Sequence, residues 1–226
     1  MYLNRGRLVT PDELIGPIFV FARVSLLFIV RRPSAYGFFF SLLLGIGLSA
    51  SCGLRVFVPL LVANVAFLSG YLPLNTGFEW MGSWVAFGIL LVATLTEIGA
   101  YYIPWLDHLL DTIALPTAFV AGTLLTTSVL GDASPVLRWV LGLIVGGGSA
   151  GVVQAGTGLI RLGSSATTGG LGNPVVATLE NTLSILFSVL TLWVPLMIGL
   201  LALLLVGFLI RKLLKRNKSN SSAGVG

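Results

Sequence analysis

Long apolar runs separated by short polar segments make up most of the chain from residue 36 onwards. The hydrocarbon core of a bilayer is about 30 Å thick, and a helix needs about 20 apolar residues to cross it. Runs of this length predict an all-α integral membrane protein with about six transmembrane helices. The predicted spans are residues 36–71, 81–103, 109–130, 136–160, 174–192 and 194–210.

The first apolar run is too long for one straight crossing, because a helix rises about 1.5 Å per residue. It extends from Tyr36 to Tyr71, and Arg55 is its single charged residue. The segment 47–53, Gly-Leu-Ser-Ala-Ser-Cys-Gly, lies at its middle and is rich in small residues. We therefore expect a break, a strong tilt or a re-entrant turn there.

The segment before this run is predicted to form an amphipathic helix. Thr10 can cap it, Pro11 suits its first position, and Glu13 completes a capping box. Arg23 lies at the centre of the apolar run 14–30, so we expect the helix to lie in the membrane interface, although the run could also span. The predicted divisions are an N-terminal interfacial helix, a polytopic membrane domain and a disordered tail, at residues 1–35, 36–216 and 217–226.

Composition supports a membrane protein. Charged residues are 9% of the 226 and hydrophobic residues are 56%, with a mean hydropathy of +1.00. A soluble domain carries about 25% charged residues. These values exclude a soluble globular enzyme, a nucleic-acid binder and a disordered chain. Cys52 is the only cysteine, which excludes an internal disulfide.

Basic residues cluster near the two ends of the chain and indicate its orientation. The predicted spans would put both termini on one side, which the positive-inside rule makes cytoplasmic. That side would hold five N-terminal arginines, five C-terminal basic residues and Arg161, against Arg138 alone on the other. We expect a bacterial inner membrane protein that is surrounded by lipid and could form a homo-oligomer or join a larger membrane complex.

Two short strings occur twice in the chain. Ala93-Thr-Leu-Thr-Glu97 resembles Ala177-Thr-Leu-Glu180, and Gly47-Leu-Ser-Ala50 resembles Gly147-Gly-Ser-Ala150. Two halves of three spans each would have opposite orientations, which is a common plan of transporters. Chance is the alternative, because small residues are frequent in such helices. The predicted inverted repeats are residues 36–131 and 135–213.

Three ionisable residues lie within predicted spans: Arg55, Glu97 and Glu180. A charge at the centre of a membrane helix costs about 2.5–3.5 kcal/mol unless it is paired or hydrated. Gln154 and Arg161 share one glycine-rich helix face. These residues could line a pathway for an ion or polar solute, or form a structural ion pair, and the sequence leaves both open. Glu180 also begins a polar stripe that continues with Ser184, Ser188 and Thr191.

The stretch 164–174, Ser-Ser-Ala-Thr-Thr-Gly-Gly-Leu-Gly-Asn-Pro, is the most distinctive in the chain. Gly169, Gly170 and Gly172 could expose backbone N–H and C=O groups to a ligand. A loop with that role should turn back toward the bundle. The alternative is an exposed connector in which Asn173 caps the next helix.

Asp107, His108 and Asp111 form a polar group at one predicted helix end. Two carboxylates and an imidazole could bind a divalent cation or relay protons. A single histidine is weak evidence for a metal, and a carboxylate also stabilises the N-terminus of a helix. We favour the latter role and predict no cofactor.

Four strings of the chain resemble the bacterial membrane family catalogued as domain of unknown function 4126. The resemblance covers roughly residues 40–215 and implies an integral membrane protein, but no established activity, so it implies no catalytic residue. The strings are Gly47-Leu-Ser-Ala-Ser-Cys-Gly-Leu-Arg55, Phe78-Glu-Trp-Met-Gly-Ser-Trp84, Pro104-Trp-Leu-Asp-His-Leu-Leu-Asp111 and Ala166-Thr-Thr-Gly-Gly-Leu-Gly-Asn-Pro-Val-Val-Ala177.

Two functions remain open from the sequence. A small transporter or channel for an ion or small polar solute is favoured by the repeated strings and the charges within spans. A structural or assembly subunit of a membrane complex is the alternative, favoured by the glycine-rich helix face. An enzyme is not expected, since no H-E-x-x-H motif, Ser-His pair or P-loop is present. A continuous polar cavity that reaches Glu97 or Glu180 would favour the transporter.

Overall fold

The structure is a computed structural model that describes residues 3–4, 7–8, 35–72, 74–131, 133–193 and 201–211. Apart from one antiparallel pair of two-residue strands, β1 (Leu3–Asn4) and β2 (Arg7–Leu8), the regular structure of these residues is helical. The predicted helix from Pro11 to about residue 31 and the predicted disordered tail 217–226 lie outside the described residues, so both stay predictions.

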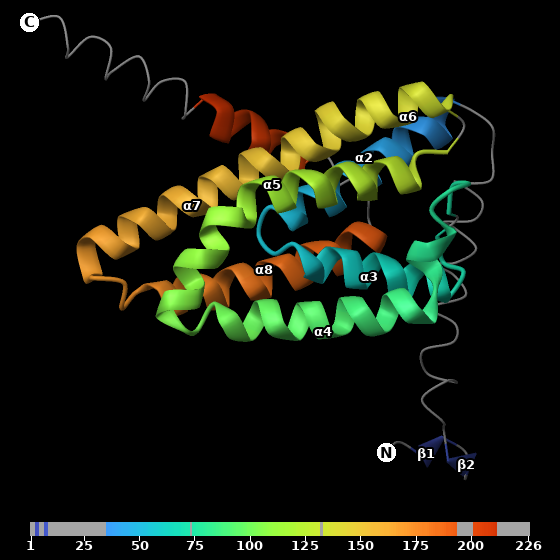
Figure 1. Cartoon of the computed structure of the whole chain (residues 1–226). Helices are drawn as coiled ribbons and strands as arrows, with labels where there is room; N and C mark the ends of the chain where they lie inside the picture. Colours follow the sequence, from blue (N-terminus) through green and yellow to red (C-terminus); the bar gives the residue numbers. More distant parts are fainter. Residues whose placement is uncertain are drawn as a thin grey trace, which may run out of the picture.

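The helices pack side by side as an elongated bundle (Figure 1). One long rod runs from Pro135 to Thr168, because α6, a π-helical segment and α7 continue one another. We call it the α6–α7 rod. The elements are α2 (Ala35–Cys52), α3 (Phe57–Leu68), the short 3-10 helix Glu79–Gly82, α4 (Trp84–Ala100), α5 (Pro104–Val129), α6 (Pro135–Leu141), the π segment Gly142–Gly147, α7 (Gly148–Thr168), α8 (Asn173–Trp193) and a final helix, Leu201–Arg211.

Three described helices are long and apolar enough to cross a membrane: Leu109–Val129, Pro135–Thr168 and Asn173–Trp193. They coincide with the predicted spans 109–130, 136–160 and 174–192, and the second helix continues further than predicted. The remaining apolar helices in the described ranges are shorter, and residues 194–200 of the last predicted span are outside them. A membrane protein is therefore supported, but the count of six spans is not confirmed.

The distribution of side chains on α8 is that of a membrane helix. Val175 and Leu179 are 64% and 57% exposed, while Ser184 and Ser188 on the opposite face are 0% exposed. Large apolar side chains facing water would be unfavourable along a whole helix, and a bilayer removes that cost. The predicted polar stripe of α8 is confirmed as a buried face.

The segment 36–71 forms a helical hairpin and not one crossing. Ser49 of α2 donates a 2.7 Å hydrogen bond to the Gly122 carbonyl of α5, so α2 runs antiparallel to α5 and begins at the C-terminal end of α5. Asn75, which follows α3, donates to the Leu130 carbonyl just beyond α5. The α2–α3 hairpin thus enters and leaves at one end of the bundle, as the re-entrant alternative predicted.

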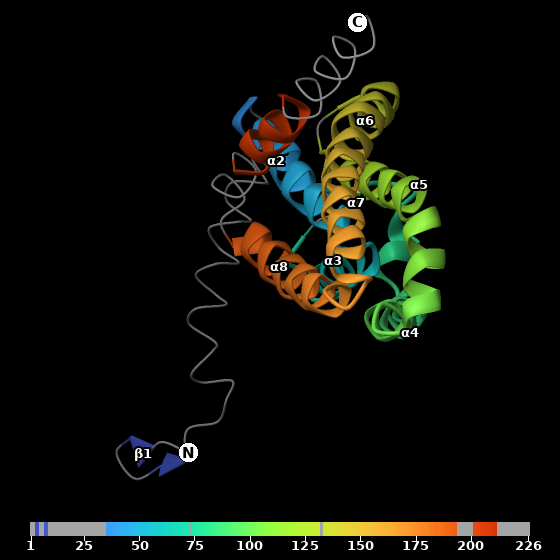
Figure 2. The ribbon, with the colours of Figure 1, turned by 90° about the vertical axis from the view of Figure 1, so that its left-hand side faces the viewer.

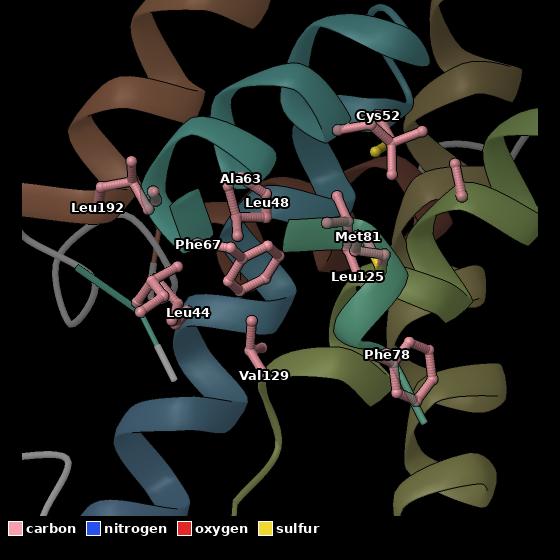
Figure 3. Close-up of a cluster of buried hydrophobic side chains, with 14 of the residues drawn as sticks. Leu44, Leu48, Cys52, Ala63, Phe67, Phe78, Met81, Leu125, Val129 and Leu192 are labelled. Carbon is pink, nitrogen blue, oxygen red and sulfur yellow. The ribbon is translucent and has the colours of Figure 1, made fainter. Parts of the chain in front are cut away.

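The hairpin is held by an apolar core on its α5 side. Leu48 and Cys52 of α2, Phe67 of α3 and Leu125 of α5 belong to one buried cluster (Figure 3). Viewed along the bundle, α3 lies toward its centre, in contact with α4 and α8 (Figure 2). The core fixes the body of the hairpin, so that its tip, residues 53–56, has a defined position.

Small residues hold α5 against the α6–α7 rod. A Cβ atom added at Gly146 would lie 2.5 Å from the Gly122 carbonyl oxygen and would overlap the Thr126 hydroxyl. At Gly147 it would lie 2.6 Å from the Thr123 hydroxyl. Helices in membranes associate closely through such glycine contacts. We call this contact the α5–rod seam.

Candidate functional site: a buried charge chain at the hairpin tip

The hairpin tip lies at mid-bundle. A Cβ atom at Gly53 would be 2.5 Å from the Ala150 carbonyl oxygen, and the Thr157 hydroxyl donates to the Gly53 carbonyl at 3.4 Å. Both partners belong to the middle of the 34-residue α6–α7 rod. Ser184, at the middle of α8, donates to the Ser51 carbonyl at 3.3 Å. The break in the hairpin is therefore far from both ends of the helices around it.

Arg55 projects from this tip into the protein, with a side chain that is 1% exposed. Its Nη2 lies 3.1 Å from a carboxylate oxygen of Glu180 and donates to the Ala177 carbonyl at 3.2 Å. Its Nε donates to Oδ1 of Asn181. One turn of α8 thus satisfies the guanidinium, as a buried charge requires.

Glu180 also binds Arg161 of α7, which in turn meets α5. The Nε of Arg161 lies 3.2 Å from both carboxylate oxygens of Glu180, and its Nη2 contacts the same carboxylate. Its Nη1 lies 3.6 Å from Oδ1 of Asp111. We call the series Arg55, Glu180, Arg161 and Asp111 the charge chain. It links the hairpin tip to three helices.

Tyr101, directly after α4, supports both arginines. Its ring centroid is 3.7 Å from the Cζ atom of Arg55 and 4.2 Å from that of Arg161. A guanidinium over an aromatic ring gains about 2 kcal/mol when it is desolvated. The ring therefore helps Glu180 to hold the guanidinium groups of Arg55 and Arg161 close together despite their mutual repulsion.

Glu97 of α4 holds the other side of the tip. Its carboxylate accepts hydrogen bonds from the backbone N–H groups of Val56, at 2.7 Å, and Phe57, at 2.9 Å. These groups lie at the start of α3, where N–H groups lack partners within the helix and the helix dipole favours negative charge. Glu97 and Glu180 are 7% and 4% exposed and contact consecutive residues of the tip. Both side chains therefore face the interior of the bundle.

The charges of this part of the structure do not cancel. Glu97, Asp111 and Glu180 contribute three carboxylates, and Arg55 and Arg161 contribute two guanidinium groups. With all five ionised, one negative charge is left over. The positive end of the α3 helix dipole balances part of this excess negative charge. The unbalanced part makes the region favourable for a cation.

Cavities reach both sides of the charge chain. One of about 290 Å³ lies among α3, α4 and α5 and is lined in part by Glu97 and Tyr101. Another, of about 420 Å³, lies between α5 and α7 and is lined in part by Asp111 and Gln154. The charges are buried, but open space adjoins them.

A protein-family model described as "Domain of unknown function (DUF4126)" matches residues 42–215. The chain belongs to this family. Neither the curated proteins nor the solved structures include a match. The matched DUF4126 region contains the whole charge chain, together with Glu97 and Tyr101, so the site belongs to the family domain.

The glycine-rich loop of the DUF4126 domain is an exposed connector and does not join the charge chain. α7 continues to Thr168, so the connection is four residues long, and Leu171 within it is 86% exposed. Gly169 and Gly170 have φ angles of 64° and 91°, which glycine adopts at little cost. Of the two alternatives that the sequence left open for Gly169, Gly170 and Gly172, the structure agrees with the exposed connector.

Asn173 lies at the base of this connector and joins its two helices. It is 5% exposed, and its Nδ2 donates to the Ser165 hydroxyl at 3.1 Å. The bond links the start of α8 to the last turns of α7. We assign it a structural role, apart from the charge chain.

The proposed metal ligands are only partly described. Asp107 and His108 belong to α5, but their side chains lie outside the described structure, and Asp111 is a member of the charge chain. Among the described residues, no three His, Cys, Asp or Glu residues gather as a metal site would require. The dipole role predicted for this group stays a prediction.

Two members of the site, Tyr101 and Asn181, were not predicted from the sequence. Tyr101 follows Glu97 by four residues, a spacing that places both on one helical face, and Asn181 directly follows Glu180. The signal that could have identified both residues was therefore their closeness in the sequence to a charged residue within a predicted span. Asp111 was predicted as a helix-dipole carboxylate or a weak metal ligand, whereas its observed partner is Arg161.

Proposed function

We propose that this protein is a small transporter or channel that carries an ion or a small polar solute across a bacterial inner membrane. One observation carries the proposal: a chain of ionised side chains meets the tip of a hairpin that ends at mid-bundle, with one cavity at Glu97 and Tyr101 and another at Asp111. Charges within membrane proteins are costly and mark pathways more often than structural contacts. The proposal involves no enzymatic step.

Broken helices at mid-bundle are a recurring device of transporters, because their free ends can bind ions and can move as short levers. Glu97 and Glu180 hold the tip from two different helices, α4 and α8. Neutralising either group would loosen one side of the tip and leave the other attached. The inverted repeat of residues 36–131 and 135–213 would give this arrangement an origin, and we retain it as part of the proposal.

The proposed orientation follows the positive-inside rule. Leu209 of the final helix packs on Gly156 of α7, so this helix runs along the rod toward the end that carries the 169–172 connector. The basic residues that follow Arg211 make that end cytoplasmic. Reporter fusions at Lys218 and Thr76 should then report opposite sides, and a shared side would contradict the orientation.

A structural or assembly subunit is the second candidate, because the arginines of the charge chain already have protein partners. Flux assays separate the two functions. We would measure the movement of a panel of small cations, anions and uncharged polar solutes across proteoliposomes that contain wild-type protein, Asp111→Asn, Glu97→Gln or the exposed control Glu79→Gln.

We expect flux of at least one solute above that of protein-free liposomes. It should fall about tenfold or more in Asp111→Asn and Glu97→Gln at equal incorporation, since a lost charge interaction of about 1.4 kcal/mol has that effect. Glu79→Gln should match the wild type. No flux for any solute, or loss of folded protein in place of flux, would favour the structural subunit.

A further inference from the structure

The cavity between α5 and α7 has the dimensions of a site for a small organic molecule. Its volume is about 420 Å³, whereas one water occupies about 30 Å³ in the liquid. A dehydrated ion would leave most of it empty, and sites for small organic ligands begin at about 300 Å³. Gly158 lines the cavity, and a Cβ atom there would have no neighbour within 4 Å. The size therefore favours a molecule over a bare ion.

A carboxylate and an amide provide the polar part of the cavity. The Asp111 side chain is 27% exposed, in contrast to 6% for Glu180, so it is the accessible acid of the charge chain. Gln154 is only 7% exposed. Its backbone carbonyl accepts from Thr157, but no hydrogen bond joins its side-chain amide to the residues that the structure describes. The amide can therefore offer its donors and its acceptor to a ligand in the cavity.

Apart from the hydroxyl of Thr112, the rest of the cavity is apolar. Leu115, Leu159 and Leu162 line it beside Ala155. A ligand that fits this lining has one polar end and a hydrocarbon body. The polar end must also carry positive charge, because the region already holds three carboxylates against two guanidinium groups.

We propose that this cavity binds a small alkylammonium group, with its nitrogen between Asp111 and Gln154 and its hydrocarbon part against the leucines. Asp111 would balance its charge, and the Oε1 atom of Gln154 would accept one of its N–H groups. The inference deepens the proposed function by naming the substrate class, and it rests on that function for the step from binding to transport. The ammonium could belong to a soluble amine or to an aminophospholipid headgroup.

The probe is n-butylammonium, with n-butanol and butyrate as neutral and anionic analogues. Binding would be measured by calorimetry on the full-length protein in a neutral detergent. We expect butylammonium to bind and both analogues to bind at least about tenfold more weakly, the equivalent of one charge interaction. Equal affinity for butanol, or tighter binding of butyrate, would overturn the proposal.

Variants locate the binding in this cavity. Asp111→Asn should weaken butylammonium about tenfold, and Gln154→Leu should weaken it several-fold. Gly158→Leu should fill the cavity and abolish binding while the protein stays folded, because a Cβ atom at this position meets no neighbour within 4 Å. The matched control is Gly148→Leu on the same helix, which also has open space at its Cβ position. Unchanged binding in Gly158→Leu would overturn the proposal even if Asp111→Asn failed to fold.

Nanodiscs distinguish the two sources of the ammonium. Competition against butylammonium by phosphatidylethanolamine, but not by phosphatidylcholine, would identify a lipid headgroup, and no competition would identify a soluble amine; both agree with the site. Binding without flux would refute the proposed transport and leave this site standing. Flux of other solutes without ammonium binding would refute this site and leave transport standing.

Discussion

The charge chain and the α5–rod seam both bury residues of α5, yet different forces hold them. In the chain, Asp111 and the other three members attract one another through charges at the ends of their side chains. In the seam, Gly146 lets two backbones approach so closely that a single added carbon would overlap Thr126. The chain depends on charge and the seam on shape.

This difference indicates where the protein can move. Ion pairs can exchange partners when a charge enters or leaves, because the side chains that make them have several rotamers. A glycine seam has one close-packed arrangement, and any sliding would separate its backbones. We expect conformational change to occur at the α2–α3 hairpin tip while α5 and the α6–α7 rod move together.

The largest effect should come from breaking the charge chain at its centre. Glu180→Gln removes the carboxylate shared by Arg55 and Arg161 and leaves two buried cations close to one another. We expect a loss of about 3–5 kcal/mol in stability, measured as a fall in melting temperature in detergent. Glu79→Gln is the matched control at an exposed site. A melting temperature equal to that of the control would show that the ion pairs do not hold the bundle.

A smaller loss should follow from adding one methyl group to the seam. Gly146→Ala places its Cβ against Gly122 and Thr126, and overpacking of this kind costs about 1–3 kcal/mol. Gly148→Ala, two residues later on the same rod, meets no atom within 4 Å and should be neutral or slightly stabilising. Thermal unfolding of the pair measures the seam directly. Similar melting temperatures for the two variants would mean that the helices do not pack as described.

The smallest effect concerns an exposed charge that belongs to neither region. Hydrogen bonds from its own backbone N–H and from that of Gly77 lower the pKa of the Glu79 carboxyl. Because the folded-state pKa lies below the unfolded value of about 4.3, these bonds stabilise the fold above that pH, and the contribution is lost as the pH falls through the folded-state value. The small difference in melting temperature between wild type and Glu79→Gln should therefore disappear on acidification from pH 7 to below the folded-state pKa. A difference that persisted or grew in acid would contradict this assignment.

Helix identity and buried faces could be predicted from the sequence because they depend on local patterns. The apolar runs predicted the three long helices, and the spacing of Glu180, Ser184 and Ser188 predicted a buried polar face. The partner of Asp111 could not be predicted, since Arg161 lies 50 residues away and only packing brings them together. The direction in which the chain continues after the hairpin tip could not be predicted either, because α2 and α3 are apolar on all sides.

The glycine-rich connector shows a different limit. Its composition suggested a long irregular loop. Instead, α7 continues to Thr168, whose hydroxyl donates to the Ser164 carbonyl and accepts from the Gly172 N–H. Only Gly169 and Gly170 then need left-handed backbone. Composition shows how many small residues the segment contains, but not how few of them the turn requires.

The hairpin also determines which compartment each part of the chain faces. A segment that returns to the end it entered adds no change of side, so residue 37 and Thr76 lie toward the same end of the bundle, whereas Arg211 lies toward the opposite one. The number of times that the chain crosses the membrane then determines whether the two termini lie on the same side. If both are cytoplasmic, the residues before Ala35 must cross the bilayer once, and the apolar run 14–30 is the segment long enough to do so. If that run lies in the interface, the N-terminal and C-terminal basic clusters face opposite sides of the membrane.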